Sequence, residues 1–275
     1  MSVFSERKID CHNHIFDPQR FAYQANTYHP SGAEIASADT FYTVMDTYGV
    51  SHALIVGPNS AYGENDNRAL LDAVARSNGR CKGMAVVSMD TSLAQLQELA
   101  EQGIAGVTFN IAFYGPEHFA RCDSLLDKLA QLGLIAQFQI AGDQLGGGLK
   151  DKFTGSGARL LIDHCGRPVL EQGLDAPGFA DVLQLADSGR AWIKVSGFDK
   201  FSQQAWPFAD TQPVVEQIKQ AFGDDKLIWG SDWPFLKPRQ RLDYGTLLAL
   251  AERQFPEPEQ RANYFWRNAA ELLGF

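Results

Sequence analysis

Short apolar runs rich in β-branched residues alternate along the chain with longer stretches of helical periodicity. The short runs are centred near Ile9, Leu54, Met84, Val107, Ala136, Leu161, Ile193 and Ile228. The predicted helices are 39–48, 67–77, 92–101, 119–132, a short one near Leu149, 178–188, 213–222 and 244–254, and a ninth, 259–273, closes the chain. Strands that alternate with helices in this way indicate a parallel sheet.

Eight such units in 275 residues favour one closed (β/α)8 TIM barrel with an extra C-terminal helix. An open doubly wound sheet is the alternative, but it usually has fewer strands and a glycine-rich phosphate turn. Because no long linker or composition shift divides the chain, the sequence predicts a single domain over residues 1–275. One insertion after the first strand, residues 15–38, is expected to form a lid or a pocket wall.

The end of the first predicted strand carries two histidines, His12 and His14, in the run Asp-Cys-His-Asn-His. Side chains two residues apart on a strand project from the same face, so the two imidazoles can converge on one point. The carboxyl ends of barrel strands are where active sites lie. The position of the pair therefore predicts a catalytic or metal-binding role.

Two more polar residues follow the sixth and eighth predicted strands. His164 is in phase with Leu160 and Ile162, and Asp232 is in phase with Ile228, when alternate residues are counted. We therefore expect both strands to point these residues towards the barrel axis. His12, His14, His164 and Asp232 would then meet at one mouth of the barrel.

These motifs together resemble the amidohydrolase superfamily. The runs IDCHNHIFDP, GVTFN, LIDHCGRP, KVSG and WGSDWP are similar, in order, to its lactonase branch, which includes 2-pyrone-4,6-dicarboxylate lactonase and sugar-acid lactonases. The resemblance implies a hydrolase that opens a sugar-acid or (di)carboxylic-acid lactone with water. It implies that Asp232 moves the proton, while His12, His14 and His164, or a metal that they hold, polarise the carbonyl.

A binuclear metal centre is not expected, because many superfamily members add a histidine on strand 5 and a carboxylated lysine or a glutamate on strand 4. Here strand 5 reads Leu-Ile-Ala-Gln-Phe-Gln and strand 4 ends Thr-Phe-Asn. His12, His14 and Asp232, with or without His164, still suit one Zn²⁺ with an open position for water. We expect no tightly bound cofactor, with a single zinc ion as the alternative.

Substrate recognition is predicted from polar residues on the loops that follow the strands. Arg167 is the leading carboxylate-binding candidate because its planar fork binds carboxylates through two hydrogen bonds, although a structural ion pair is the alternative. Lys200 is another candidate, with a solvated side chain as its alternative. The further candidates are Tyr28, Asn59, Asn110 and Gln139. Thr108 and Tyr114 stand where the pyrone-dicarboxylate pattern has arginines, so a monoanionic or neutral, hydroxyl-rich lactone fits better.

Composition narrows the remaining choices. The net charge of −9, without a basic run, argues against nucleic acid, and mean hydropathy of −0.22 without a long apolar run argues against a membrane span. The polar N-terminus lacks the apolar segment of a signal peptide, and the four cysteines form no CxxC pair, so a cytoplasmic protein with reduced thiols is expected. The expected partner is a small anionic or hydroxyl-rich lactone; the sequence does not decide whether the chain forms a homo-oligomer.

Three alternatives to hydrolysis remain open. Lactone isomerisation uses the same carbonyl activation but a substrate hydroxyl in place of water, and non-oxidative decarboxylation is a third reaction on this scaffold. A catalytically silent barrel that binds a metabolite is the alternative outside enzymes. The presence of all four site residues, His12, His14, His164 and Asp232, argues against that last reading.

Overall fold

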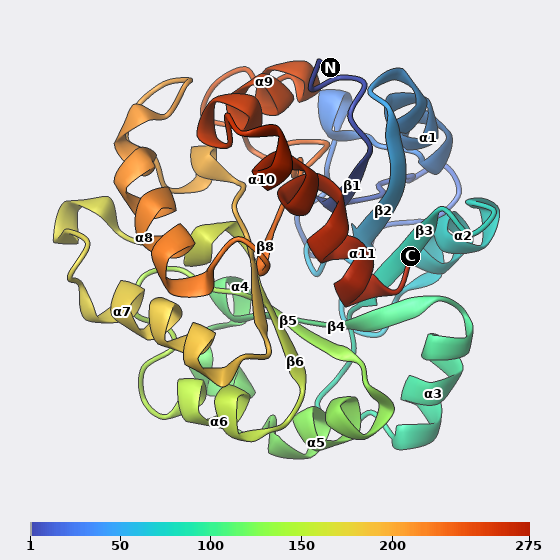
Figure 1. Ribbon diagram of the computed structural model, residues 1–275. Coiled ribbons are helices and arrows are strands. Elements are labelled where there is room, and N and C mark those ends of the chain that lie inside the picture. The colour runs from blue at the N-terminus through green and yellow to red at the C-terminus, as the bar shows by residue number, and fades with distance from the viewer. Residues whose placement is uncertain (1) are drawn as a thin grey trace.

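The computed structural model describes residues 2–275 and contains one eight-stranded parallel sheet with the strands in sequence order (Figure 1). The strands are β1 (Lys8–Asn13), β2 (Val50–Val56), β3 (Cys81–Ala85), β4 (Ile104–Asn110), β5 (Ile135–Gln139), β6 (Arg159–Ile162), β7 (Ala191–Lys194) and β8 (Leu227–Ile228). The first and last strands of the sheet meet where the amide of Cys11 in β1 donates a hydrogen bond to the carbonyl of Trp229, just after β8, at 3.0 Å. The predicted TIM barrel is therefore confirmed.

Helices surround the strands and connect each to the next (Figure 1). They are α1 (Ala38–Thr47), α2 (Arg68–Arg76), α3 (Leu93–Glu101), α4 (Ile111–Tyr114), α5 (Asp123–Leu132), α6 (Leu149–Gly155), α7 (Pro177–Gln184), α8 (Gln212–Phe222), α9 (Tyr244–Gln254), α10 (Pro258–Ala262) and α11 (Asn268–Leu273). The prediction of a helix from residue 119 began too early: a separate 3-10 turn, Pro116–Phe119, precedes α5. Pro116 starts that turn, and the turn ends before α5 begins at Asp123, so the two segments are not one continuous helix.

The barrel has two apolar layers. Outside it, alternate strand residues such as Val107 and Phe138 pack against helix residues such as Phe41 and Leu125. Inside it, the other strand residues, among them Ile9, Leu54, Met84, Ile135, Leu161, Trp192 and Ile228, form a second cluster with residues of α11. Burial of both strand faces accounts for the nearly continuous apolar runs in the sequence.

The C-terminal helix α11 closes one end of the barrel (Figure 1). Ala269, Leu272 and Leu273 are buried in the inner cluster, and Arg159, the first residue of β6, donates to the carbonyl of Leu272 at 2.7 Å. This contact places α11 at the amino ends of the strands. The opposite end, where the strands finish, is left for a binding pocket. No helix within residues 2–275 is long and apolar enough to cross a membrane.

Candidate active site

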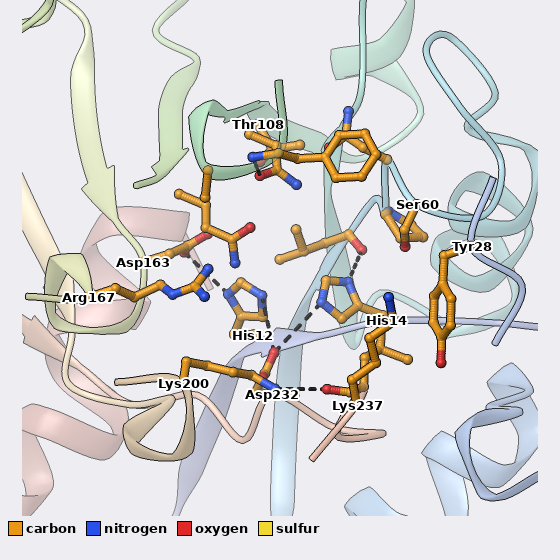
Figure 2. Close-up of a pocket in the computed structure, with 18 of the residues that line it drawn as sticks. His12, His14, Tyr28, Ser60, Thr108, Asp163, Arg167, Lys200, Asp232 and Lys237 are labelled. Carbon is orange, nitrogen blue, oxygen red and sulfur yellow. Dashed lines mark hydrogen bonds and ion pairs between the residues drawn. The ribbon is translucent and has the colours of Figure 1, made fainter. Parts of the chain in front are cut away.

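A pocket of about 390 Å³ opens at the carboxyl ends of the strands. Figure 2 shows Arg167 on one side of it and Tyr28 on the other, with His12 and His14 between them. Tyr28 comes from the long loop after β1, which therefore forms a wall of the pocket. Of the predicted substrate-binding residues, Tyr28, Asn59, Asn110, Gln139, Arg167 and Lys200 all line it.

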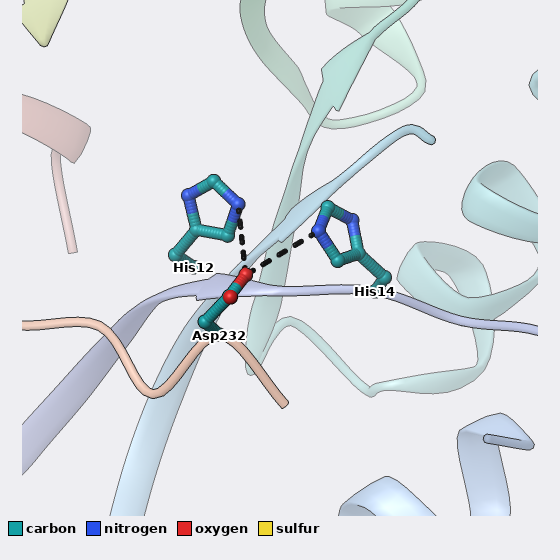
Figure 3. A group of neighbouring side chains, drawn as sticks. All are labelled: His12, His14 and Asp232. Atoms are coloured by element: carbon teal, nitrogen blue, oxygen red, sulfur yellow. Dashed lines mark ion pairs between the residues drawn. The ribbon is translucent and has the colours of Figure 1, made fainter. Parts of the chain in front are cut away.

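Asp232 lies at the centre of the three predicted histidines. Its Oδ1 is 3.7 Å from Nε2 of His12, 3.8 Å from Nε2 of His14 and 3.6 Å from Nε2 of His164. Figure 3 shows the carboxylate facing the first two imidazoles. The structure thus brings together the four residues that the sequence singled out.

An extra residue in β1 aims the two histidines. In the pairing with β2, Asp10 is opposite Ala53 and Asn13 is opposite Ile55, so three steps along β1 match two along β2. This bulge turns His12 into the barrel, although Asp10, two residues earlier, faces α9 through a hydrogen bond to Tyr244. The amide of Asp232 donates to the carbonyl of His12 at 2.8 Å, which holds Asp232 beside the imidazole.

The prediction of which β6 side chains point into the barrel was wrong. Leu160 and Ile162 pack outwards against the helices, and Leu161 faces the barrel interior. Alternation alone would therefore send His164 outwards. Its φ of +51°, in a turn of four positive φ values that ends at Arg167, redirects the buried imidazole towards Asp232. For β8 the phase was correct, since Ile228 belongs to the inner cluster.

The charges around Asp232 keep its carboxylate ionised. Burial alone would raise the pKa of Asp232, but the Lys200 ammonium, 3.1 Å from Oδ2, is the largest of the effects that lower it by more. Burial lowers the pKa of His14 to about 4 and holds the pKa of His164 well below its usual value. The site therefore combines a carboxylate with two neutral imidazoles near pH 7.

The same atoms fit one divalent ion. Single ligand atoms of His12, His14 and Asp232 lie within 4.8 Å of one another. Nδ1 of His14 donates to the carbonyl of Val56 at 2.8 Å, which leaves its Nε2 free to bind a metal. Two imidazoles and a carboxylate are ligands that Zn²⁺ accepts.

Two cations in the pocket differ in how they are paired. Lys200 is not solvated: its Nζ contacts Asp232 and also Asp199, at 3.1 Å each. Arg167 has no acid within ion-pair distance in the described chain, and its buried Nε has no hydrogen-bond partner. The structural ion pair considered for Arg167 is therefore not observed, and its guanidinium is available to a ligand.

The other predicted substrate contacts are partly engaged by the protein. Tyr28 donates its hydroxyl to Glu34, and Lys237 lies over the Tyr28 ring at 3.8 Å from its centroid. Oδ1 of Asn110 caps α4 by accepting from the amide of Phe113 at 3.2 Å. Sequence reasoning missed Lys237 and Arg239, two exposed cations on the loop after β8 that also line the pocket.

Sequence reasoning placed Lys194 and Gln137 among the possible substrate contacts and did not predict that they form a buried polar network with Asp163 directly beneath the site. Asp163, Gln137 and Lys194 are buried inside the barrel and contact one another and His12. Alternation on β7 carried the signal, because Lys194 is in phase with Trp192 of the inner cluster. His29, His52 and His118 make packing or hydrogen-bond contacts elsewhere.

The fold, with three histidines around Asp232 at the carboxyl ends of the strands, is that of an amidohydrolase-type TIM barrel. The chain belongs to the amidohydrolase family, whose model, described as "Amidohydrolase", matches residues 9–275. It is 29% identical over 276 residues to a 4-sulfomuconolactone hydrolase from Rhizobium radiobacter, covering 96% of this chain and 89% of that protein. It is 30% identical over 281 residues to a 2-pyrone-4,6-dicarboxylate hydrolase from Comamonas testosteroni, with coverage of 96% and 89%.

Other similar proteins include a lactone isomerase and two solved structures. A D-galactarolactone isomerase from Agrobacterium fabrum is 24% identical, covering 91% of this chain and 84% of that protein. The structure of a probable 2-pyrone-4,6-dicarboxylic acid hydrolase from Acinetobacter baumannii, with citric acid bound, superposes with a TM-score of 0.88 at 26% identity over 98% and 99% of the two chains. A zinc-containing amidohydrolase from Burkholderia multivorans shares the fold at 18% identity, covering 98% and 99% of the chains with a TM-score of 0.77. The expected resemblance to the lactonase branch is confirmed.

Proposed function

We propose that this chain hydrolyses a lactone that carries one anionic group, with Asp232 as the proton-transfer residue. The observation that carries the proposal is the ionised Asp232 carboxylate, 3.6 to 3.8 Å from three imidazoles at the base of the pocket. The named lactone hydrolases among the relatives support the same reaction class.

The residues account for each proton and bond. A water oxygen attacks the ring carbonyl as Asp232 accepts one of its protons, and an imidazole donor stabilises the negative charge that develops on the carbonyl oxygen. The ring C–O bond then breaks, and Asp232 returns the proton to the leaving alkoxide. The product is a hydroxy acid that ionises and releases one proton to solvent.

Substrate charge is inferred from Arg167. This guanidinium faces the pocket without an acidic partner, and a carboxylate or sulfonate on the lactone would supply one. Burial lowers the pKa of Arg167 and an anionic ligand would oppose that effect. Lys237 and Arg239 at the rim add positive charge that attracts an anion.

The metal state is a separate question within the proposal. If one divalent ion binds, His12, His14 and Asp232 would hold it, and it would supply Lewis-acid polarisation of the carbonyl. The steps assigned to Asp232 and to the anion-binding Arg167 are the same in either case.

The test is a proton-release screen with neutral, monoanionic and dianionic lactones. Chelator-treated enzyme is assayed with and without Zn²⁺, beside Asp232→Asn and, as a control, Asp151→Asn on the exposed face of α6. We expect acid release that falls by about 10²- to 10⁴-fold in Asp232→Asn only. Normal activity in Asp232→Asn, or no acid release with any lactone, would refute the proposal.

Isomerisation is the second candidate because of the isomerase relative. A substrate hydroxyl would then replace water as the nucleophile, and one lactone would become another without net proton release. NMR of the ring protons in the same reactions detects this outcome directly. Conversion between lactones without acid would assign the isomerase.

A further inference from the structure

The polar network beneath the pocket centres on Lys194, at the end of β7. Its Nζ lies 2.8 Å from Oδ1 of Asp163, 2.7 Å from Oε1 of Gln137 and 3.0 Å from Nδ1 of His12. The Lys194 side chain is fully buried, and so are its three partners. Figure 2 shows Asp163 beside His12 at the base of the pocket.

Counting donors and acceptors shows which nitrogen of His12 carries the proton. An ammonium has three protons, and Lys194 has three neighbouring atoms to receive them. If Nδ1 of His12 carried a proton, one ammonium proton would point at an N–H group in a fully buried place. Such an unpaired buried donor costs more than a hydrogen bond gains.

Asp163 competes for the same nitrogen, since its Oδ1 is 3.2 Å from Nδ1 of His12 and would favour a proton there. However, each carboxylate oxygen of Asp163 already accepts one hydrogen bond. Oδ1 accepts from Lys194 at 2.8 Å, and Oδ2 accepts from the Gln137 amide at 3.1 Å. Among the described residues, no further atom accepts the third proton of the Lys194 ammonium. We therefore expect Nδ1 of His12 to accept that proton rather than carry its own.

We propose that Lys194 is a positioning residue that holds His12 as the tautomer protonated on Nε2. The Nε2–H group then faces Asp232 and the pocket, 3.7 Å from Oδ1 of Asp232. His14 has the opposite tautomer, because its Nδ1 donates to the carbonyl of Val56 and its Nε2 is bare. The two histidines of the HxH motif are thereby divided into a donor and an acceptor.

This division has a consequence for the reaction and one for metal binding. The role of His12 as the donor to the ring carbonyl rests on the proposed function, whereas its tautomer does not. A metal needs a bare nitrogen, so binding through Nε2 of His12 requires its proton to move to Nδ1, against Lys194. Lys194 therefore weakens zinc binding at His12, His14 and Asp232.

The first test is two-bond ¹H–¹⁵N NMR of the histidine rings in the substrate-free, metal-free enzyme at neutral pH. His12 is assigned by comparison with a His12→Gln spectrum. We expect a bare Nδ1 and a protonated Nε2. A proton on Nδ1, with or without one on Nε2, would overturn the proposal. This result is independent of activity, so it also stands or falls separately from lactone hydrolysis.

The second test removes the ammonium. In Lys194→Met, Oδ1 of Asp163, 3.2 Å away, is the hydrogen-bond partner that remains for Nδ1 among residues 2–275, so the proton should move to Nδ1. Zn²⁺ should then bind about 10- to 100-fold more tightly in chelator competition. Gln137→Leu is the matched buried control: it disturbs the same network but retains the Lys194–His12 contact, so tautomer and zinc affinity should stay as in the parent. Unchanged zinc affinity in folded Lys194→Met would overturn the proposal, and the NMR of the parent protein decides if that variant does not fold.

Discussion

Asp163 and Lys194 form a 2.8 Å ion pair inside the barrel, with both side chains almost completely buried. Burial alone would raise the pKa of Asp163, but the Lys194 ammonium lowers it by more, to well below its usual 3.8. A carboxyl whose pKa is lower in the folded state stabilises that state above about pH 4. The contribution disappears as the pH falls through the lower, folded-state value.

Asp163→Asn is therefore expected to destabilise the protein most at neutral pH. It leaves the Lys194 charge buried without its partner, which costs about 3–5 kcal/mol. Urea unfolding at pH 7, 5 and 3 measures the difference in free energy of unfolding between the parent and the variant. That difference should be similar at pH 7 and 5 and smaller at pH 3. A difference that grows as the pH falls would contradict the assigned direction of the pKa shift.

The fold and the four central residues could be predicted because both depend on repeated local patterns. Alternation of apolar runs with helical stretches fixed the number of units, and His12, His14 and Asp232 stand at strand ends where barrels place their sites. The orientation of His164 could not be predicted, because a backbone turn with positive φ overrides the alternation of β6. The partners of Lys194 come from three separate strand regions and become neighbours only when the barrel closes.

Gly197→Ala is expected to displace His164. A Cβ at this position would lie 2.4 Å from Nδ1 of His164, and the backbone φ is +63°. We expect kcat to fall by about 10²-fold, the usual scale for a displacement of about 1 Å at a reacting centre. Steady-state kinetics with the best lactone of the screen provides the measurement.

Gly189→Ala separates backbone strain from the clash. Its φ is +65°, but apart from its chain neighbours no atom of the described residues lies within 4 Å of the added Cβ. The strained positive φ should cost each variant about 1 kcal/mol of stability, and Gly197→Ala should lose more because its Cβ must displace the buried His164. Only Gly197→Ala should lose activity; equal losses of activity in the two variants would show that the position of His164 is not the cause.

Tyr244→Phe tests the support behind β1. Oδ2 of Asp10 accepts from the Tyr244 hydroxyl at 2.9 Å and from the Ser231 hydroxyl at 2.6 Å, in a fully buried place. Removal of one donor should cost about 1–3 kcal/mol of unfolding free energy. Tyr48→Phe, on the neighbouring ring that stacks on Tyr244, is the control and should change stability by less than about 0.5 kcal/mol. Equal urea midpoints for Tyr244→Phe and the parent would contradict the role of this hydrogen bond.

Arg167→Gln is expected to change which lactones are used. The free guanidinium in the pocket would make a charge-assisted hydrogen bond only to an anionic substrate, and such bonds contribute about 1.5–3 kcal/mol. The value of kcat/KM should therefore fall by about 10- to 100-fold for a monoanionic lactone and by less than about 3-fold for a neutral one of the same ring size. Most of the fall should appear as a higher KM, because the contact is present in both ground and transition states.

The ratio of the two kcat/KM values is the decisive quantity, because it cancels any general loss of folded enzyme. Arg241→Gln is the control: this exposed arginine pairs with Asp243 at 2.9 Å, lies outside the pocket lining, and should leave the ratio unchanged. An equal loss with both lactones in Arg167→Gln would mean that Arg167 supports the shape of the pocket. The anion-binding contact would then have to be sought at Lys237 or Arg239, the other cations of the rim that have no acidic partner within ion-pair distance in residues 2–275.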